Sequence, residues 1–439
     1  MIENGTWQAR THRGLESVLE EELKSAGAKY LYVSDGNIKF KADEKELYHF
    51  LLNTFVCTSV EVLLSQPMDI READITTLTN AVPWQDVIPL ESVFKVQALN
   101  NGTHKSGLRN LATELEKSIS SFFKKQFGSA PKVATAEEEP EFVVLLHVEN
   151  NGSCYLALEA GGEPFASRAV ANSTEGGMLS PALAAGLILM SGWDKTSVFI
   201  DPFAGDGTFV LEAARIAKNR TPAFENDDFL MKRWRTFRHA LWKKTREALL
   251  PEIRKDVNWI NAIESRRFIF NVLQTSVRKN RLTENINLKI GNAHDIFIPS
   301  APGVIMAAPH AKADAEILDK FVKHVKKFAG GYTLSLFTPL NNLDSLLNMK
   351  PDRVLKIDYD EREYSFMQFE IFKPVRKEFP PKQGDEKKGR YKRDGKPERK
   401  PYKSVGADRK HQVGRFKGKG ERTERPKRDG KPSGKRGRA

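Results

Sequence analysis

Apolar residues along this chain alternate between short strand-like runs and longer segments with helical spacing, a pattern that predicts a mixed α/β protein. In residues 15–26, leucines recur at every fourth position, the spacing of one helix face, and Gly27 follows as a stop. A strand pair over residues 30–40 and a helix over residues 44–54 complete a first small unit.

A second unit of the same kind extends to about residue 160. Its expected elements are a strand at residues 92–98, a helix at 107–125, and strands at 141–149 and 153–158. The Ala- and Glu-rich residues 131–140 between them predict a surface loop.

From Glu163 onward the pattern becomes a longer α/β series. The expected strands cover residues 197–201, 257–263, 286–290, 303–306, 331–337 and 364–372, with helices between most of them. Strands that are separated by helices predict a parallel sheet with crossover connections. A ligand site is then expected at the carboxyl ends of the strands.

The clearest candidate for such a site is the turn at residues 201–208, Asp-Pro-Phe-Ala-Gly-Asp-Gly-Thr, which lies between a strand and a helix. Gly205 and Gly207 allow a sharp turn and a close approach of a ligand to the backbone. Asp201 and Asp206 would repel a pyrophosphate, but they suit the cationic sulfonium and amino groups of S-adenosylmethionine. A purely structural turn is the alternative.

Composition narrows the function classes. The longest apolar run, residues 183–190, suits one buried helix and is too short to span a membrane. The N-terminus lacks an export signal, and Cys57 and Cys154 are the only cysteines, so we expect a cytoplasmic protein without a disulfide framework. The cysteines and histidines have no metal-ligand spacing, so no metal site is indicated. Because the apolar run is short, no membrane partner is indicated either.

Charge is segregated along the sequence. Residues 376–439 hold 25 Lys and Arg against 9 Asp and Glu, whereas the remainder of the chain is nearly neutral. Such a polar, like-charged segment cannot bury enough apolar surface to offset its ordering entropy, which predicts disorder. It could serve only solubility, but its charge and its interspersed Tyr391, Tyr402 and Phe416 favour a nonspecific nucleic-acid anchor that can stack these rings on unpaired bases.

Three segments together resemble the bacterial THUMP-domain RNA methyltransferases, in particular those that make N2-methylguanosine in 23S ribosomal RNA: residues 7–28, 99–119 and 200–214. The turn at residues 201–208, with Leu-Glu-Ala-Ala at 211–214, is similar to the family pattern D-P-F-C-G-S-G-T followed by I-E-A-A.

The resemblance implies four regions, which we expect at residues 1–60 (ferredoxin-like), 61–160 (THUMP, RNA-binding), 161–375 (Rossmann-like methyltransferase) and 376–439 (disordered tail). It also implies that S-adenosylmethionine is bound by Asp201, Gly205, Asp206 and Gly207.

Two further cofactor positions depart from the family pattern. Where the family has D-I-D, whose first carboxylate accepts from the ribose hydroxyls, this chain has Ala262-Ile263-Glu264, so Glu264 is the available acceptor. Asn292 replaces an acidic residue near the adenine, and its oxygen can still accept from the adenine amino group.

The target-base motif departs most. Where the family has N-P-P-Y or N-P-P-F, this chain has Ala307-Ala308-Pro309-His310. The resemblance implies that Ala308, Pro309 and His310 contact the target base. Ala307 has no side-chain acceptor for an exocyclic amine, although His310 could stack on a base. Arg168 is the one arginine that remains of the family's R-G-Y-R.

These features leave more than one function open. The resemblance favours guanine-N2 methylation of ribosomal RNA, whereas the losses at ligand-contacting positions fit a catalytically degenerate RNA-binding or ribosome-assembly protein. A DNA adenine amino methylase is a more distant alternative. The Arg- and aromatic-rich residues 232–239 predict either an RNA contact or an amphipathic helix with its rings turned inward.

Overall fold

The computed structural model describes ten ranges of the chain: residues 5–69, 75–101, 108–149, 153–169, 179–255, 257, 259–309, 315–339, 347–360 and 362–373. The predicted disordered tail at 376–439 and the candidate His310 lie outside the described residues.

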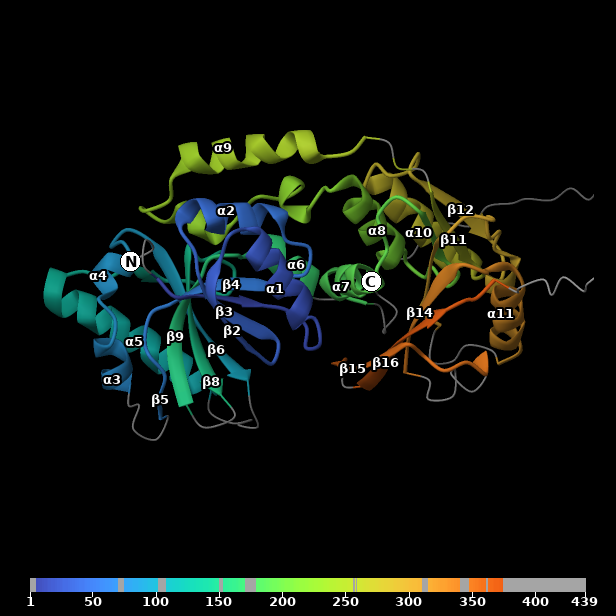
Figure 1. Ribbon diagram of the computed structural model, residues 1–439. Helices are drawn as coiled ribbons and strands as arrows, with labels where there is room; N and C mark the ends of the chain where they lie inside the picture. The colour runs from blue at the N-terminus through green and yellow to red at the C-terminus, as the bar shows by residue number, and fades with distance from the viewer. Residues whose placement is uncertain are drawn as a thin grey trace, which may run out of the picture. The chain divides into compact units, whose positions relative to one another are not determined.

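The N-terminal part of the described chain forms one mixed sheet in the order β2-β3-β1-β4-β9-β8-β6-β7, with β5 paired to β9 (Figure 1). Its strands are β1 (Trp7–Arg10), β2 (Lys29–Ser34), β3 (Asn37–Lys41), β4 (Ser59–Leu63), β5 (Met68–Asp69), β6 (Val93–Asn101), β7 (Lys132–Val133), β8 (Phe142–Glu149) and β9 (Ser153–Glu159). The predicted strands are confirmed, whereas β1, β4 and β5 were not expected and β7 lies in the expected loop.

Alternation along these strands directs one face of the sheet to the apolar core. Trp7 of β1 is paired with Val62 of β4, and both are buried, whereas Gln8, the next residue of β1, belongs to the opposite face. The accompanying helices are α1 (Glu16–Ser25), α2 (Glu44–Asn53), α3 (Ile75–Asn80), α4 (Trp84–Val87), α5 (Leu108–Phe127) and α6 (Glu163–Ala169). Because β4 pairs with both β1 and β9, the sheet continues across the expected domain boundary at residue 60.

The C-terminal part forms a second sheet in the order β12-β11-β10-β13-β14-β16-β15 (Figure 1). Its strands are β10 (Val198–Asp201), β11 (Ile260–Glu264), β12 (Ile286–Ile290), β13 (Gly303–Ala307), β14 (Tyr332–Thr338), β15 (Arg353–Tyr359) and β16 (Arg362–Glu370). The first five are parallel to one another, as predicted.

The prediction of a parallel sheet is wrong at one edge, where β16 runs antiparallel to both β14 and β15. Strand β15 was not predicted at all. Only Ile357 among its seven residues is buried, because the strand lies at the sheet edge, so its sequence lacks a long apolar run.

The helices of this part precede or connect the parallel strands of the sheet. They are α7 (Pro181–Met190), α8 (Thr208–Lys218), α9 (His239–Leu249), α10 (Arg267–Lys279) and α11 (Ala315–Phe328), with short 3-10 turns η2 (Pro222–Phe224), η3 (Leu230–Arg233), η4 (Leu250–Glu252) and η5 (Ala293–Asp295). The α7 helix is buried nearly all round, as its uniformly apolar sequence predicts. The mixed α/β class is thereby confirmed.

Among the described residues, no helix combines the length and the apolar composition that crossing a bilayer requires.

Candidate active site

The turn that follows β10 is shaped by two glycines with left-handed backbone. Gly205 has φ +53° and Gly207, which caps the start of α8, has φ +95°. A Cβ atom on Gly207 would lie 2.5 Å from Cδ1 of Leu273 in α10. The turn therefore requires glycine at residue 207 for both its conformation and its packing.

Asp201, the last residue of β10, is fully buried. Its Oδ1 accepts a hydrogen bond from Phe203 N–H at 3.1 Å, whereas Oδ2 has no partner in the described part of the chain. Burial raises the pKa of Asp201 to about 8 against the hydrogen bond from Phe203, and the charges of Glu264 and Asp206 act in the same direction as burial. One oxygen of this buried carboxyl group is thus left without a hydrogen-bond donor among the described residues.

Asp206 lies inside the turn and is held by the first residue of α8. Its Oδ1 accepts from the backbone N–H of Thr208 at 3.1 Å and from the Thr208 hydroxyl at 2.8 Å. Burial raises the pKa of Asp206 despite these two hydrogen bonds. Asp201 and Asp206 therefore place two carboxyl groups at the carboxyl end of β10.

Glu264 is the last residue of the neighbouring strand β11 and is 5% exposed. Its Oε2 accepts from Gly205 N–H at 3.0 Å, which joins the end of β11 to the glycine turn. Ala262 lies two residues earlier, paired with Asp201 within the strand and 2% exposed. The acidic side chain at the strand end is therefore Glu264.

Sequence reasoning missed Arg266, which also binds this carboxylate. Its Nε donates to Oε1 of Glu264 at 3.0 Å, and its backbone N–H donates to the same oxygen at 2.8 Å. One feature could have indicated a special role for Arg266: it occupies the N-cap of α10, a position at which Ser, Thr, Asp and Asn are preferred.

Asn292 follows the next strand, β12, and is half-buried. Gly291, the residue before it, donates its N–H to the carbonyl oxygen of Glu264 at 3.1 Å. The Asn292 side chain forms a capping box with Asp295 at the start of η5. The ends of β10, β11 and β12 thus bring together Asp201, Gly205, Glu264 and Asn292, as expected for one site.

The residues expected to contact the target base follow β13, on the other side of β10 from β11. Ala307 is fully buried in an apolar cluster with Ile305 and Leu336. Pro309 is buried and Ala308 is partly buried. In the register of the parallel strands, Ile200 pairs with Ile305, so β13 ends beside Asp201.

Arg168 does not face this site. Its Nη1 and Nη2 donate to Glu212 Oε1 and Oε2 at 3.2 and 3.0 Å, and Nη2 also donates to the carbonyl oxygen of Phe55 at 2.7 Å. Glu212 lies within α8 and is 1% exposed. Arg168 therefore anchors α8, the helix that follows the glycine turn. The sequence could have indicated this role, because Glu212 is a charged residue on an otherwise apolar face of α8 and needs a partner.

In the basic and aromatic segment 232–239, the rings are turned inward. Trp234 and Phe237 are each 7% exposed, and Trp234 stacks on Trp7 with 6.4 Å between ring centroids. The expected helix begins only at His239. Stacking of these two rings on RNA is therefore excluded in this conformation, and the inward alternative is confirmed for them.

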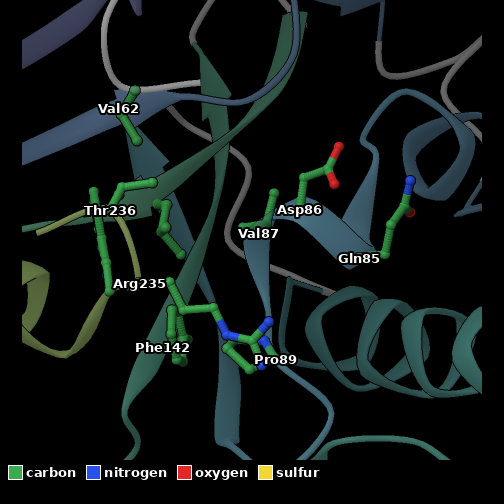
Figure 2. A pocket seen from close by; sticks show the side chains of 10 residues that line it. Val62, Gln85, Asp86, Val87, Pro89, Phe142, Arg235 and Thr236 are labelled. Carbon is green, nitrogen blue, oxygen red and sulfur yellow. The ribbon is translucent and has the colours of Figure 1, made fainter.

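The same segment contributes to a pocket in the N-terminal part (Figure 2). The pocket is lined by Val62, Gln85, Asp86, Val87, Pro89, Phe142, Leu158, Trp234, Arg235 and Thr236. Arg235 is exposed and forms an ion pair of 3.8 Å with the equally exposed Glu91. None of the candidate cofactor residues lines this pocket.

The described residues contain no group of three or more His, Cys, Asp or Glu side chains that could hold a metal ion. Cys57 and Cys154 are buried free thiols, and burial raises the pKa of each.

Two family comparisons match this chain. Residues 168–356 match the family described as RMKL-like, methyltransferase domain. Residues 6–54 match the RlmL ferredoxin-like domain.

Solved structures share the fold at low sequence identity. SMU.472, crystallised with SAH, has a TM-score of 0.73 at 19% identity, covering 84% of this chain and 99% of that chain. A predicted N6-adenine-specific DNA methylase from Listeria monocytogenes str. 4b F2365 has 0.69 at 17%, covering 83% and 96%. TrmN from Thermus thermophilus has 0.60 at 16%, covering 84% and 100%.

Proposed function

We propose that this chain is an S-adenosylmethionine-dependent RNA methyltransferase, because residues 168–356 match an RMKL-like methyltransferase domain and residues 6–54 match an RlmL ferredoxin-like domain. The proposed product is N2-methylguanosine in ribosomal RNA, as the sequence resemblance implies. The observation that carries the proposal is the junction of Asp201, the glycine turn and Glu264 at the ends of adjacent strands.

The residues at this junction fit the cofactor. The buried Oδ2 of Asp201, which has no partner among the described residues, can accept from the cationic amino group of the methionine part. Gly205 and Gly207 allow close approach of the ligand, Glu264 would accept from the ribose hydroxyls, and Asn292 from the adenine amino group. The bound cofactor would supply an electrophilic methyl group on a sulfonium.

The target end is less complete. The carbonyl of Ala308 can accept one hydrogen of an exocyclic amine, and Pro309 would lie against the base. His310 would stack on the base. Because Ala307 offers no acceptor, the second hydrogen of the amine requires a partner from elsewhere.

This deficit favours a second candidate function, a noncatalytic RNA-binding or ribosome-assembly protein. Ala307 is fully buried beside Ile305 and Leu336, so the position is part of an apolar layer rather than of a polar cradle. Such a protein would keep the methyltransferase fold and its cofactor turn without the amine-binding groups.

RNA is the proposed partner because of the THUMP resemblance and the basic residues 376–439. The names of the similar structures include both a DNA methylase and TrmN, so a DNA amino methylase stays the more distant alternative. The four-region division, the disorder of the tail and the cytoplasmic location remain predictions from the sequence.

Calorimetry with S-adenosylmethionine, followed by transfer of a labelled methyl group to unmodified ribosomal RNA, tests the proposal. Label recovered as N2-methylguanosine is the expected result. Cofactor binding without transfer would leave the noncatalytic function, and absence of binding would exclude the enzyme. Asp201→Asn should weaken cofactor binding, whereas Asp194→Asn, in the turn before β10, serves as the control.

A further inference from the structure

The carboxylate of Glu264 is already saturated by donors of the protein itself. Its Oε1 accepts from the backbone N–H and the Nε of Arg266, at 2.8 and 3.0 Å. Its Oε2 accepts from Gly205 N–H at 3.0 Å and from Arg266 Nη2 at 3.4 Å. A carboxylate has about four lone-pair sites, so two of these donors must leave before two ribose hydroxyls can bind.

The guanidinium of Arg266 supplies the two donors that can leave. Its side chain is 53% exposed, so its N–H groups can bond to water instead. The other two donors are backbone N–H groups, one in the glycine turn and one at the start of α10. Removing them from Glu264 would require the backbone to move.

Arg266 lies at the N-terminus of α10, where its ion pair with Glu264 is the main interaction that stabilises its side chain. Arg266 is the N-cap of α10 and makes no side-chain cap, and the first turn contains no acidic residue. A positive charge at a helix N-terminus is unfavourable, because it meets the positive end of the helix dipole. The interaction with Glu264 therefore compensates for a poor local placement.

We propose that Arg266 is a positioning residue that competes with the ribose hydroxyls of the cofactor for Glu264. This inference rests on the proposed cofactor site. In the free protein, the guanidinium holds Glu264 against the glycine turn. Cofactor binding must displace it, so Arg266 lowers the affinity for the nucleoside.

Titration of the full-length protein with SAH, in the wild type and in Arg266→Gln, tests this competition. We expect Arg266→Gln to bind SAH about fivefold more tightly, the effect of about 1 kcal/mol for a partly exposed ion pair. Arg267→Gln is the matched control, because it removes the same charge from the next, also exposed residue and should leave the affinity unchanged. Arg266→Lys, which keeps the charge without the fork of donors, should give an intermediate affinity.

A second ligand separates competition from a general effect on folding. The gain in Arg266→Gln should be smaller for 2′-deoxy-SAH than for SAH, because the deoxy ligand has one hydroxyl fewer to offer Glu264. Equal gains for the two ligands, or SAH binding no tighter in Arg266→Gln than in the wild type, would overturn the competition and leave the proposed function standing. SAH binding by none of the proteins would overturn both.

Discussion

Arg168 and Glu212 form a two-pronged ion pair in the interior, although 44 positions separate them in the sequence. Glu212 is also bound by Arg215, and burial, which alone would raise the pKa of Glu212, is outweighed by the two arginines, so that its pKa is lowered. The pair fixes α8, whose first turn adjoins the candidate cofactor turn.

Arg168→Met should therefore lower the free energy of unfolding by about 2–4 kcal/mol, because it leaves a buried carboxylate with only one partner. Urea denaturation measures the change. Lys24→Met, which removes an exposed helical pair with Glu20, should cost less than about 0.5 kcal/mol. Similar losses of unfolding free energy in the two variants would show that the buried pair stabilises the protein no more than the exposed pair does.

Asp201→Asn should change the pH dependence of stability. The pKa of Asp201 in the folded protein is about 8, above its ordinary 3.8. The protonated carboxyl group therefore stabilises the folded state fully below about pH 4, and this stabilisation is lost as the pH rises toward 8. At pH 8 the variant should be more stable than the wild type, on the order of 2–4 kcal/mol, because an amide does not ionise. Thermal unfolding of both proteins between pH 5 and 8.5 measures the difference.

Asp194 provides a control of opposite sign. Hydrogen bonds from Ser197 and Thr196 lower its pKa, so its contribution is present above the unfolded-state pKa and is lost as the pH falls. Asp194→Asn should thus be less stable than the wild type at neutral pH, and the two proteins should converge in acid. A stability difference for Asp201→Asn that did not change with pH would contradict the burial of an ionisable group there.

Gly207→Ala should destabilise the C-terminal part of the described chain by about 2–4 kcal/mol, since the new methyl group combines left-handed backbone with overlap against Leu273. Gly128→Ala is the matched control, because Gly128 also has positive φ, +78°, but no atom lies within 4 Å of the added Cβ. Its expected cost is about 1 kcal/mol. Equal melting temperatures for the two variants would mean that Leu273 moves aside freely.

Deletion of residues 376–439 should weaken RNA binding and reduce its dependence on salt, because the segment holds 25 Lys and Arg against only 9 Asp and Glu, whereas the rest of the chain is nearly neutral. Binding to a ribosomal RNA fragment at several salt concentrations measures the slope. A second variant, in which Tyr391, Tyr402 and Phe416 become Ser, keeps every charge and should preserve the slope while losing some affinity. A slope unaffected by the deletion would refute the anchor.

Local patterns predicted much of the secondary structure. The glycine turn after β10 and the helix that follows it were predicted because the apolar run, the two glycines and the helical spacing all lie within about 20 residues. Strands β1, β4 and β15 were missed, because their assignment depends on pairing partners rather than on a long apolar run.

The candidate site divides in the same way. The sequence by itself determined which residue types are present, including the two carboxylates of the turn and the missing acceptor at Ala307. Only the tertiary structure decided that Glu264 lies at the end of β11 while Ala262 is inside it, since a strand ends where its pairing with neighbours ends. It also decided that Arg168 binds Glu212 and that Arg266 saturates Glu264, because these contacts depend on how the chain packs rather than on residue type alone.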